Sequence, residues 1–273
     1  MYTERFAEQL PLLFDGDLMA DHPADRRFKA VMDDVAGMSS ENALALLNLA
    51  SSLLPEDEAY LEVGSYKGLT LTAAMLGNAG AEFHAIESFR EFDVDGQTKA
   101  ELFANLTRWV DTSRLTLHEG DAFRLLSRPG LIRRPVGVYF YDGNHSRTAH
   151  AIALAMAEPY LADESLVIVD DASWPRVAEP TERYVARTPG YELLFDLASA
   201  EDNEGRWWNG VKVYRYRRPE QGPGAARALS VRLRRAWYLW AYEPAWHFAW
   251  RFLPRHPKLT AFLRKVLPTK GIV

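Results

Sequence analysis

The most constraining feature of this chain is a regular alternation between short apolar runs and longer stretches with helical spacing. The apolar runs are rich in β-branched and aromatic residues, as buried strands are. They fall at residues 59–65, 82–88, 114–120, 136–142, 165–171, 191–197 and 210–217. Alternation of this kind is typical of an α/β fold in which helices cover both faces of a mostly parallel sheet. We therefore expect a doubly wound, Rossmann-like domain.

Two further segments flank this region. Residues 1–54 have helical character, with a serine cap at Ser39 and Ser40 before an apolar run that ends at Pro55. Residues 219–273 contain ten Lys or Arg against two acids, a balance of +8, so the first 218 residues carry −13. We predict an N-terminal helical cap (1–54), a central domain (55–218) and a basic, aromatic-rich helical extension (219–273).

Composition excludes several kinds of site and location. The chain has no cysteine, which rules out disulfides, thiolate metal sites and cysteine nucleophiles. The first residues, "MYTERFAEQL", lack the apolar core of a signal peptide. No run of about 18 apolar residues predicts a membrane-spanning helix. We expect a cytoplasmic protein, with peripheral membrane contact as an alternative for the extension.

In a doubly wound sheet, ligands bind beyond the carboxyl ends of the strands, so the residues that follow each strand are the site candidates. The first strand ends in Glu62 and a Gly64-x-x-x-Gly68 loop, in which glycines would allow close approach of a ligand. The second ends in Glu87, an acid placed to accept from ribose hydroxyls or to face solvent. The third is followed by Asp121, which would either accept from an adenine amino group or cap the next helix.

The fourth and fifth strands end in acids. Asp142, Asn144 and His145 follow "VGVYFY", and Asp170 and Asp171 follow "SLVIV". Unpaired carboxylates beside such apolar strands are costly, and if the two strands are neighbours their repulsion calls for a cation. All-oxygen ligands suit Mg²⁺, Mn²⁺ or Ca²⁺ better than zinc. The alternative is that these acids serve only as turn and helix caps.

Between residues 38 and 217 the chain resembles class I S-adenosylmethionine (SAM)-dependent methyltransferases. It is most similar to the small bacterial, metal-dependent O-methyltransferases related to the macrocin-type sugar methyltransferases. The ordered motifs that carry the resemblance are "YLEVGSYKG", "AIESF", "HEGDAF", "YFYDGNH", "LVIVDDASWPR" and "WWNGVKVYRYR". The resemblance implies a seven-stranded sheet whose last strand is antiparallel to the rest.

The resemblance also implies roles for individual residues. The implied SAM-binding residues are Glu62, Gly64, Ser65, Gly68, Glu87, Ser88, Asp121 and Ala122. Asp142, Asp170 and Asp171 match three aspartates that bind a divalent metal, here expected to be Mg²⁺. His145 matches a catalytic base, and Asp142 is expected to contribute to catalysis as well. Asn144 stands where other members carry an aspartate base, which gives that role to His145.

The reaction expected from these residues is methyl transfer from SAM to a hydroxyl group. A metal that binds two substrate oxygens lowers the hydroxyl pKa, and a histidine then removes the proton. The acceptor would be a sugar, another diol or catechol, or a glycolipid. Trp174, Trp207 and Trp208 would stack on its ring or else pack between loops. The competing hypotheses are a metal-independent N- or O-methyltransferase and a non-catalytic assembly protein with the same fold.

The extension joins basic residues to four tryptophans, at positions 237, 240, 246 and 250. Pro244 and Pro254 are expected to break its helices, so that the tryptophans do not share one helical stripe. We expect it to pack in a homo-oligomer, with contact to a membrane surface as the alternative. The acidic body of the chain argues against nucleic acid as a partner.

Overall fold

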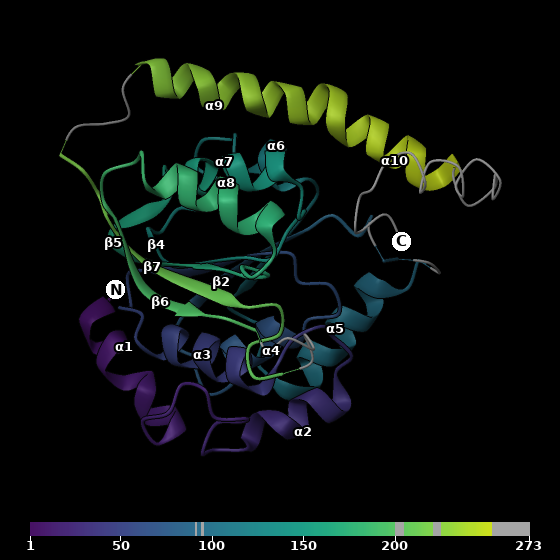
Figure 1. Ribbon diagram of the computed structural model, residues 1–273. Helices are drawn as coiled ribbons and strands as arrows, with labels where there is room; N and C mark the ends of the chain where they lie inside the picture. The colour runs from purple at the N-terminus through teal and green to yellow at the C-terminus, as the bar shows by residue number, and fades with distance from the viewer. Residues whose placement is uncertain (91, 94–95, 200–204, 221–224, 253–273) are drawn as a thin grey trace. The chain divides into compact units, whose positions relative to one another are not determined.

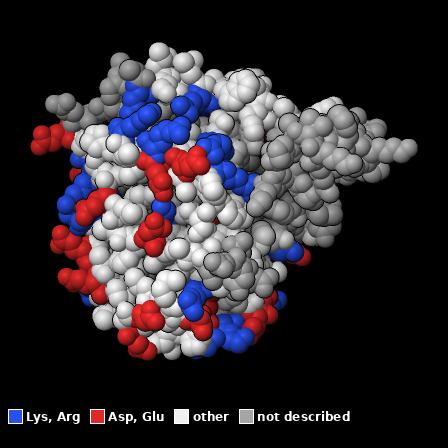
Figure 2. All heavy atoms as spheres, in the orientation of Figure 1, with Lys and Arg blue, Asp and Glu red and all other residues white. Residues whose placement is uncertain are grey.

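The computed structural model describes residues 1–90, 92–93, 96–199, 205–220 and 225–252. The chain forms two compact units, Met1–Gly222 and Pro223–Val273. Over the visible face, acidic and basic side chains are interspersed (Figure 2). Within the described part of the chain, no helix has the length and apolarity needed to cross a membrane.

The first unit is built on a seven-stranded sheet with the order β3-β2-β1-β4-β5-β7-β6. Its strands are β1 (Ala59–Val63), β2 (Glu82–Glu87), β3 (Leu115–Glu119), β4 (Val136–Tyr141), β5 (Leu161–Val169), β6 (Tyr191–Leu197) and β7 (Val211–Arg217). β7 is antiparallel to both β5 and β6, and the pairs among β1 to β5 are parallel. The predicted α/β fold, with its antiparallel last strand, is confirmed.

Helices cover both faces of the sheet, with α3, α4 and α5 on one side and α6, α7 and α8 on the other (Figure 1). The first unit contains α1 (Thr3–Gln9), η1 (Pro11–Phe14), α2 (Arg27–Asp34), α3 (Glu41–Ser52), α4 (Leu69–Met75), α5 (Thr98–Trp109), α6 (Ala122–Leu125), α7 (Arg147–Ala157) and α8 (Pro175–Val185). Every residue of β1 and of β4 is buried. Burial on both faces explains why these central strands are apolar throughout rather than alternating.

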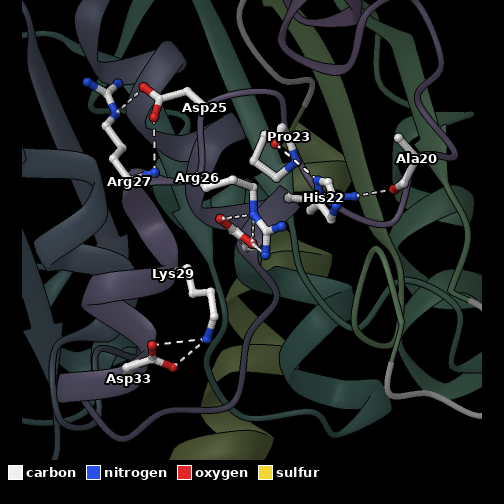
Figure 3. A network of polar contacts seen from close by, with 10 residues as sticks. Ala20, His22, Pro23, Asp25, Arg26, Arg27, Lys29 and Asp33 are labelled. Atoms are coloured by element: carbon white, nitrogen blue, oxygen red, sulfur yellow. Dashed lines mark hydrogen bonds and ion pairs between the residues drawn. The ribbon is translucent and has the colours of Figure 1, made fainter.

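The N-terminal helices belong to this unit and are joined to the rest of it by polar contacts, such as the hydrogen bond from the Ser40 hydroxyl to the Arg206 carbonyl at 2.8 Å. Ser40 caps α3 by accepting from the Ala43 N–H at 3.2 Å, as the sequence predicted. Arg26 pairs with Glu41 at 3.0 Å, within a wider network that includes the Lys29–Asp33 pair (Figure 3). The segment around α2 therefore packs against α3.

One predicted boundary was wrong. The Ala-rich pattern after β4 predicted a helix over 147–161, but α7 ends at Ala157 and β5 begins at Leu161. One reason is Pro159, which has no backbone N–H to donate and so cannot continue the helical hydrogen bonds beyond the C-cap Glu158. The residues from Leu161 onward join β5 instead, and Leu161 pairs with Val136 of β4.

The second unit is helical over its described part. It consists of α9 (Ala225–Trp237), a π-helical turn η2 (Tyr238–Tyr242) and α10 (Glu243–Phe252). The expected break at Pro244 is not observed, since the helical segments follow one another without a gap. Proline is tolerated in the first turn of a helix, where its missing N–H is not needed. Pro254 lies outside the described residues.

Candidate active site

The candidate site lies at the carboxyl ends of β1 and β4, which are neighbours at the point where the strand order reverses. The Asp142 N–H donates to the Val63 carbonyl at 2.9 Å, so the two strand ends remain paired beyond the sheet. Gly64 has φ +90°, and a Cβ added there would lie 2.0 Å from the Asp142 carbonyl oxygen. Only glycine therefore allows the two loops to approach this closely.

Glu87 joins the loops that follow β1 and β2. One carboxylate oxygen accepts from the N–H groups of Ser65 and Tyr66 at 3.0 and 2.9 Å. The other accepts from Ser88 and Phe89 at 2.6 and 2.9 Å. A carboxylate offers about four acceptor positions, so backbone donors use all of them. The predicted contact with a ribose would require some of these bonds to be exchanged, and it stays a prediction.

Glu62 is fully buried at the end of β1. Tyr60 and Thr70 donate hydroxyl hydrogen bonds to it at 2.9 and 3.0 Å. Burial raises the pKa of this carboxyl to about 7, because the hydrogen bonds that favour the charged form only partly offset the loss of solvent. Glu62 thus lies under the glycine loop as an internal residue.

Asp121 occupies the cap of the short helix α6. Its side chain accepts from the Arg124 N–H at 2.9 Å, and Ala122 begins the helix. This matches one of the two roles that the sequence left open. The contact of Asp121 with adenine and the role of Ala122 in SAM binding stay predictions.

The rim after β4 and β5 brings an imidazole between two carboxylates. His145 Nε2 lies 2.6 Å from Asp171 Oδ2 and 3.3 Å from Asp142 Oδ1. One ligand atom from each of the three residues can be chosen so that all lie within 4.8 Å of one another, a spacing that fits a metal ion. Asp170 is not one of these three residues, and its predicted role as a metal ligand stays a prediction. It is 4% exposed and accepts from the Asp171 N–H at 3.0 Å.

The charges of this cluster favour a nearby cation. Burial raises the pKa of Asp142 to about 6, and the Asp171 charge adds to the effect. Burial, together with the charges of Asp142 and Asp171, also holds the pKa of Asp170 well above its usual value. Burial alone would lower the pKa of His145, but its contacts with Asp142 and Asp171 outweigh this and raise it to about 10. An imidazolium therefore offsets one of the two carboxylate charges, and a divalent ion would offset both.

Asn209 is a site residue that the sequence did not predict. Its amide Nδ2 donates to Asp171 Oδ1 at 2.6 Å, so Asp171 is held by Asn209 on one oxygen and His145 on the other. Asn209 and Gly210 have φ +57° and +84°, values typical of an Asn-Gly turn. That dipeptide was the available signal, but on its own it predicts a turn rather than a contact with an aspartate.

Asn144 has a local structural role. Its Oδ1 accepts from the Ser146 N–H at 3.0 Å, and Ser146 in turn caps α7 by accepting from Ala149 at 3.1 Å. An amide cannot act as a base, and here it orders the turn that presents His145.

The three tryptophans expected to frame an acceptor pocket lie in different surroundings. Trp174 makes an edge contact with His145, with ring centroids 5.5 Å apart, and Arg176 lies over its ring at 4.4 Å. Trp207 is fully buried and donates to the Leu18 carbonyl at 2.8 Å. The stacking role is therefore wrong for Trp207, which packs against the N-terminal segment. Trp208 is half-buried.

The central part of the chain is similar to a known protein family. Residues 61–172 match a family described as "Methyltransferase domain". No curated protein matches the sequence.

Several solved structures share the fold at low sequence identity. A proposed O-methyltransferase of Klebsiella pneumoniae has 16% identity and a TM-score of 0.56, covering 80% of this chain and 100% of its own. An O-methyltransferase of Streptomyces achromogenes involved in tomaymycin synthesis, solved with SAM, has 16% identity, a TM-score of 0.53 and the same coverage. An O-methyltransferase of Bacillus cereus in complex with SAH has 16% identity, a TM-score of 0.52 and coverage of 71% and 92%.

Proposed function

We propose that this chain, which has the class I methyltransferase fold, transfers a methyl group from SAM to a hydroxyl oxygen with the help of a divalent cation such as Mg²⁺. The acceptor would be a sugar or another molecule with a vicinal diol or catechol. The observation that supports this proposal is the cluster of Asp142, His145 and Asp171 at the strand ends. Two carboxylates and one imidazole lie together there, beside the glycine loop expected to hold SAM.

Asp142 and Asp171 would hold the cation, and Asn209 would fix the orientation of Asp171. When bound, the cation supplies Lewis acidity that lowers the pKa of an acceptor hydroxyl. With the charges of the two carboxylates compensated in this way, His145 would no longer be held in its protonated form. The imidazole is then neutral and can act as a base near neutral pH.

His145 Nε2 faces Asp171, which leaves Nδ1 as the basic nitrogen. Nδ1 accepts the hydroxyl proton as the acceptor oxygen forms a bond to the methyl carbon of SAM. The carbon–sulfur bond breaks and its electron pair stays on sulfur, which releases S-adenosylhomocysteine. Trp174, in edge contact with His145, would form one wall of the acceptor site.

Metal dependence is tested with Asp142→Ala and with EDTA. Both should abolish transfer from labelled SAM to a panel of catechols and diol-bearing sugars, while SAM binding by calorimetry is retained. Asp163→Ala is the matched control, because Asp163 lies on β5 but is highly exposed and pairs with Arg218. Full activity in excess EDTA would contradict the proposal.

The base is tested with His145→Ala through the pH dependence of kcat. We expect a loss of about 10²- to 10⁴-fold and disappearance of the ionisation seen in the wild-type profile. Asn144→Ala, in the same turn, should keep that ionisation. A His145→Ala variant with wild-type kcat at every pH would remove the assignment.

A further inference from the structure

The second unit carries a row of exposed apolar side chains along α9. Leu229, Leu233 and Trp237 are 55%, 62% and 60% exposed, and Trp240 in the following π-helical turn is 77% exposed. The first three are spaced four residues apart and Trp240 follows after three, the intervals that place residues on one helical face. We call these four residues the apolar stripe.

The π-helical turn extends the stripe into α10. A π-turn inserts about one extra residue into a helix, and η2 covers Tyr238–Tyr242. With that residue discounted, Phe248 follows Leu229 by about five turns of 3.6 residues. Phe248 is 68% exposed. The structure therefore aligns aromatic side chains that an unbroken α-helical count would separate.

Basic side chains border the stripe. Arg232 and Arg234 are exposed and lie about 100° around the helix from its centre, one on each side. The segment 219–273 as a whole carries +8. An apolar face with Trp, Phe and Leu, bordered by arginines, is the pattern of helices that lie in the plane of a membrane interface.

We propose that α9, η2 and α10 form a docking surface for an anionic lipid membrane, with the apolar stripe entering the headgroup boundary and the arginines contacting lipid phosphates. A second copy of the chain fits less well, because pairing two stripes would bring like-charged arginine borders together. This inference does not depend on the metal or the acceptor.

The test is co-sedimentation of the full-length protein with vesicles. We expect binding to phosphatidylcholine vesicles that contain phosphatidylglycerol, weaker binding to phosphatidylcholine alone, and weakening by added salt. Leu233→Gln/Trp237→Gln should reduce binding by more than about tenfold without changing net charge. Ala228→Gln is the matched control, since Ala228 is exposed on the same helix but lies off the stripe, and it should bind like the wild type.

Arg232→Gln/Arg234→Gln should abolish the preference for anionic vesicles. Calorimetric SAM binding and light scattering are measured for each protein to establish that it is folded and how it assembles. Equal sedimentation with and without vesicles would overturn the proposal. So would a wild-type dimer that does not bind vesicles and is converted to a monomer by Leu233→Gln/Trp237→Gln, because the stripe would then be an interface between copies.

Discussion

At the β1–β2 side of the candidate site, four backbone N–H groups fill the acceptor positions of Glu87. At the β4–β5 side, the His145 imidazole contacts both Asp142 and Asp171, and the Asn209 amide donates to Asp171. In the first arrangement the hydrogen-bond donors are uncharged backbone N–H groups, and their positions are fixed by the path of the chain. The second depends on the charge of a single residue, His145. The side proposed to bind the cofactor (the cofactor side) is therefore set by backbone geometry, and the side proposed to bind the acceptor (the acceptor side) by ionisation.

The two sides meet at Gly64, and substitution there should have the largest effect. In Gly64→Ala the new Cβ would lie 2.0 Å from the Asp142 carbonyl, and the residue would also keep φ +90°. Neither loop can move away without breaking the Val63–Asp142 pairing. We expect a loss of more than about 4 kcal/mol in the free energy of unfolding, measured by urea denaturation, and no SAM binding by calorimetry.

Gly77→Ala separates the cost of a positive φ from the cost of a steric clash at the added Cβ. Gly77 has φ +78° but nothing within 4 Å of the added Cβ, so the cost should be about 1–2 kcal/mol and SAM binding should persist. Equal losses for the two variants would show that the close approach of β1 and β4 is not what requires glycine at position 64.

Glu62 is the one buried acid of the cofactor side whose ionisation should be visible in stability. Its pKa is raised from 4.5 to about 7 in the folded protein, so the folded state binds the proton more tightly than the unfolded state. The stability that protonated Glu62 contributes is fully present below pH 4.5. As the pH rises to about 7 it is lost, and the free energy of unfolding falls by about 3 kcal/mol. Glu62→Gln should remove this decline in urea-denaturation curves recorded from pH 4.5 to 8.

Tyr60→Phe is the companion variant. The Tyr60 hydroxyl donates to Glu62 and lowers its pKa, so its removal should shift the decline to higher pH. A Glu62→Gln protein with the same pH dependence as the wild type would mean that Glu62 ionises without cost in the folded protein.

The strands could be predicted because each is a short apolar run bounded by polar or glycine residues. The boundary between α7 and β5 could not, because the Ala-rich pattern continues across Glu158 and only Pro159 marks the end of the helix. The Pro244 break also failed as a prediction. Its outcome depends on where the proline falls within the helix, and Pro244 falls in the first turn of α10, directly after η2.

Some residues of the candidate site could likewise be predicted from the sequence, and others could not. The strand-end rule placed Asp142, His145 and Asp171 on one rim, but it could not distinguish Asp170 from Asp171. Both residues lie beyond the end of β5 at Val169, and the positive φ of Asp171, +54°, is not encoded in its residue type. Asn209 was missed because its contact with Asp171 spans 38 residues, and no local pattern encodes it.

Asn209 offers the finest test of the acceptor side, since it acts on one oxygen of Asp171 without contributing charge. Asn209→Gly preserves the positive φ of the turn and removes only the amide donor. We expect metal affinity, measured by calorimetry with Mn²⁺, to fall by about 10- to 100-fold, the usual effect of losing a residue that orients a ligand. SAM affinity should stay unchanged, because the cofactor side is held by backbone donors. Asn209→Asp keeps the shape but places a second anion beside Asp171, so it should restore cation binding while raising the pH at which binding begins. If Asn209→Gly weakens SAM and metal binding equally, the two sides are coupled and the contrast between backbone geometry and ionisation does not hold.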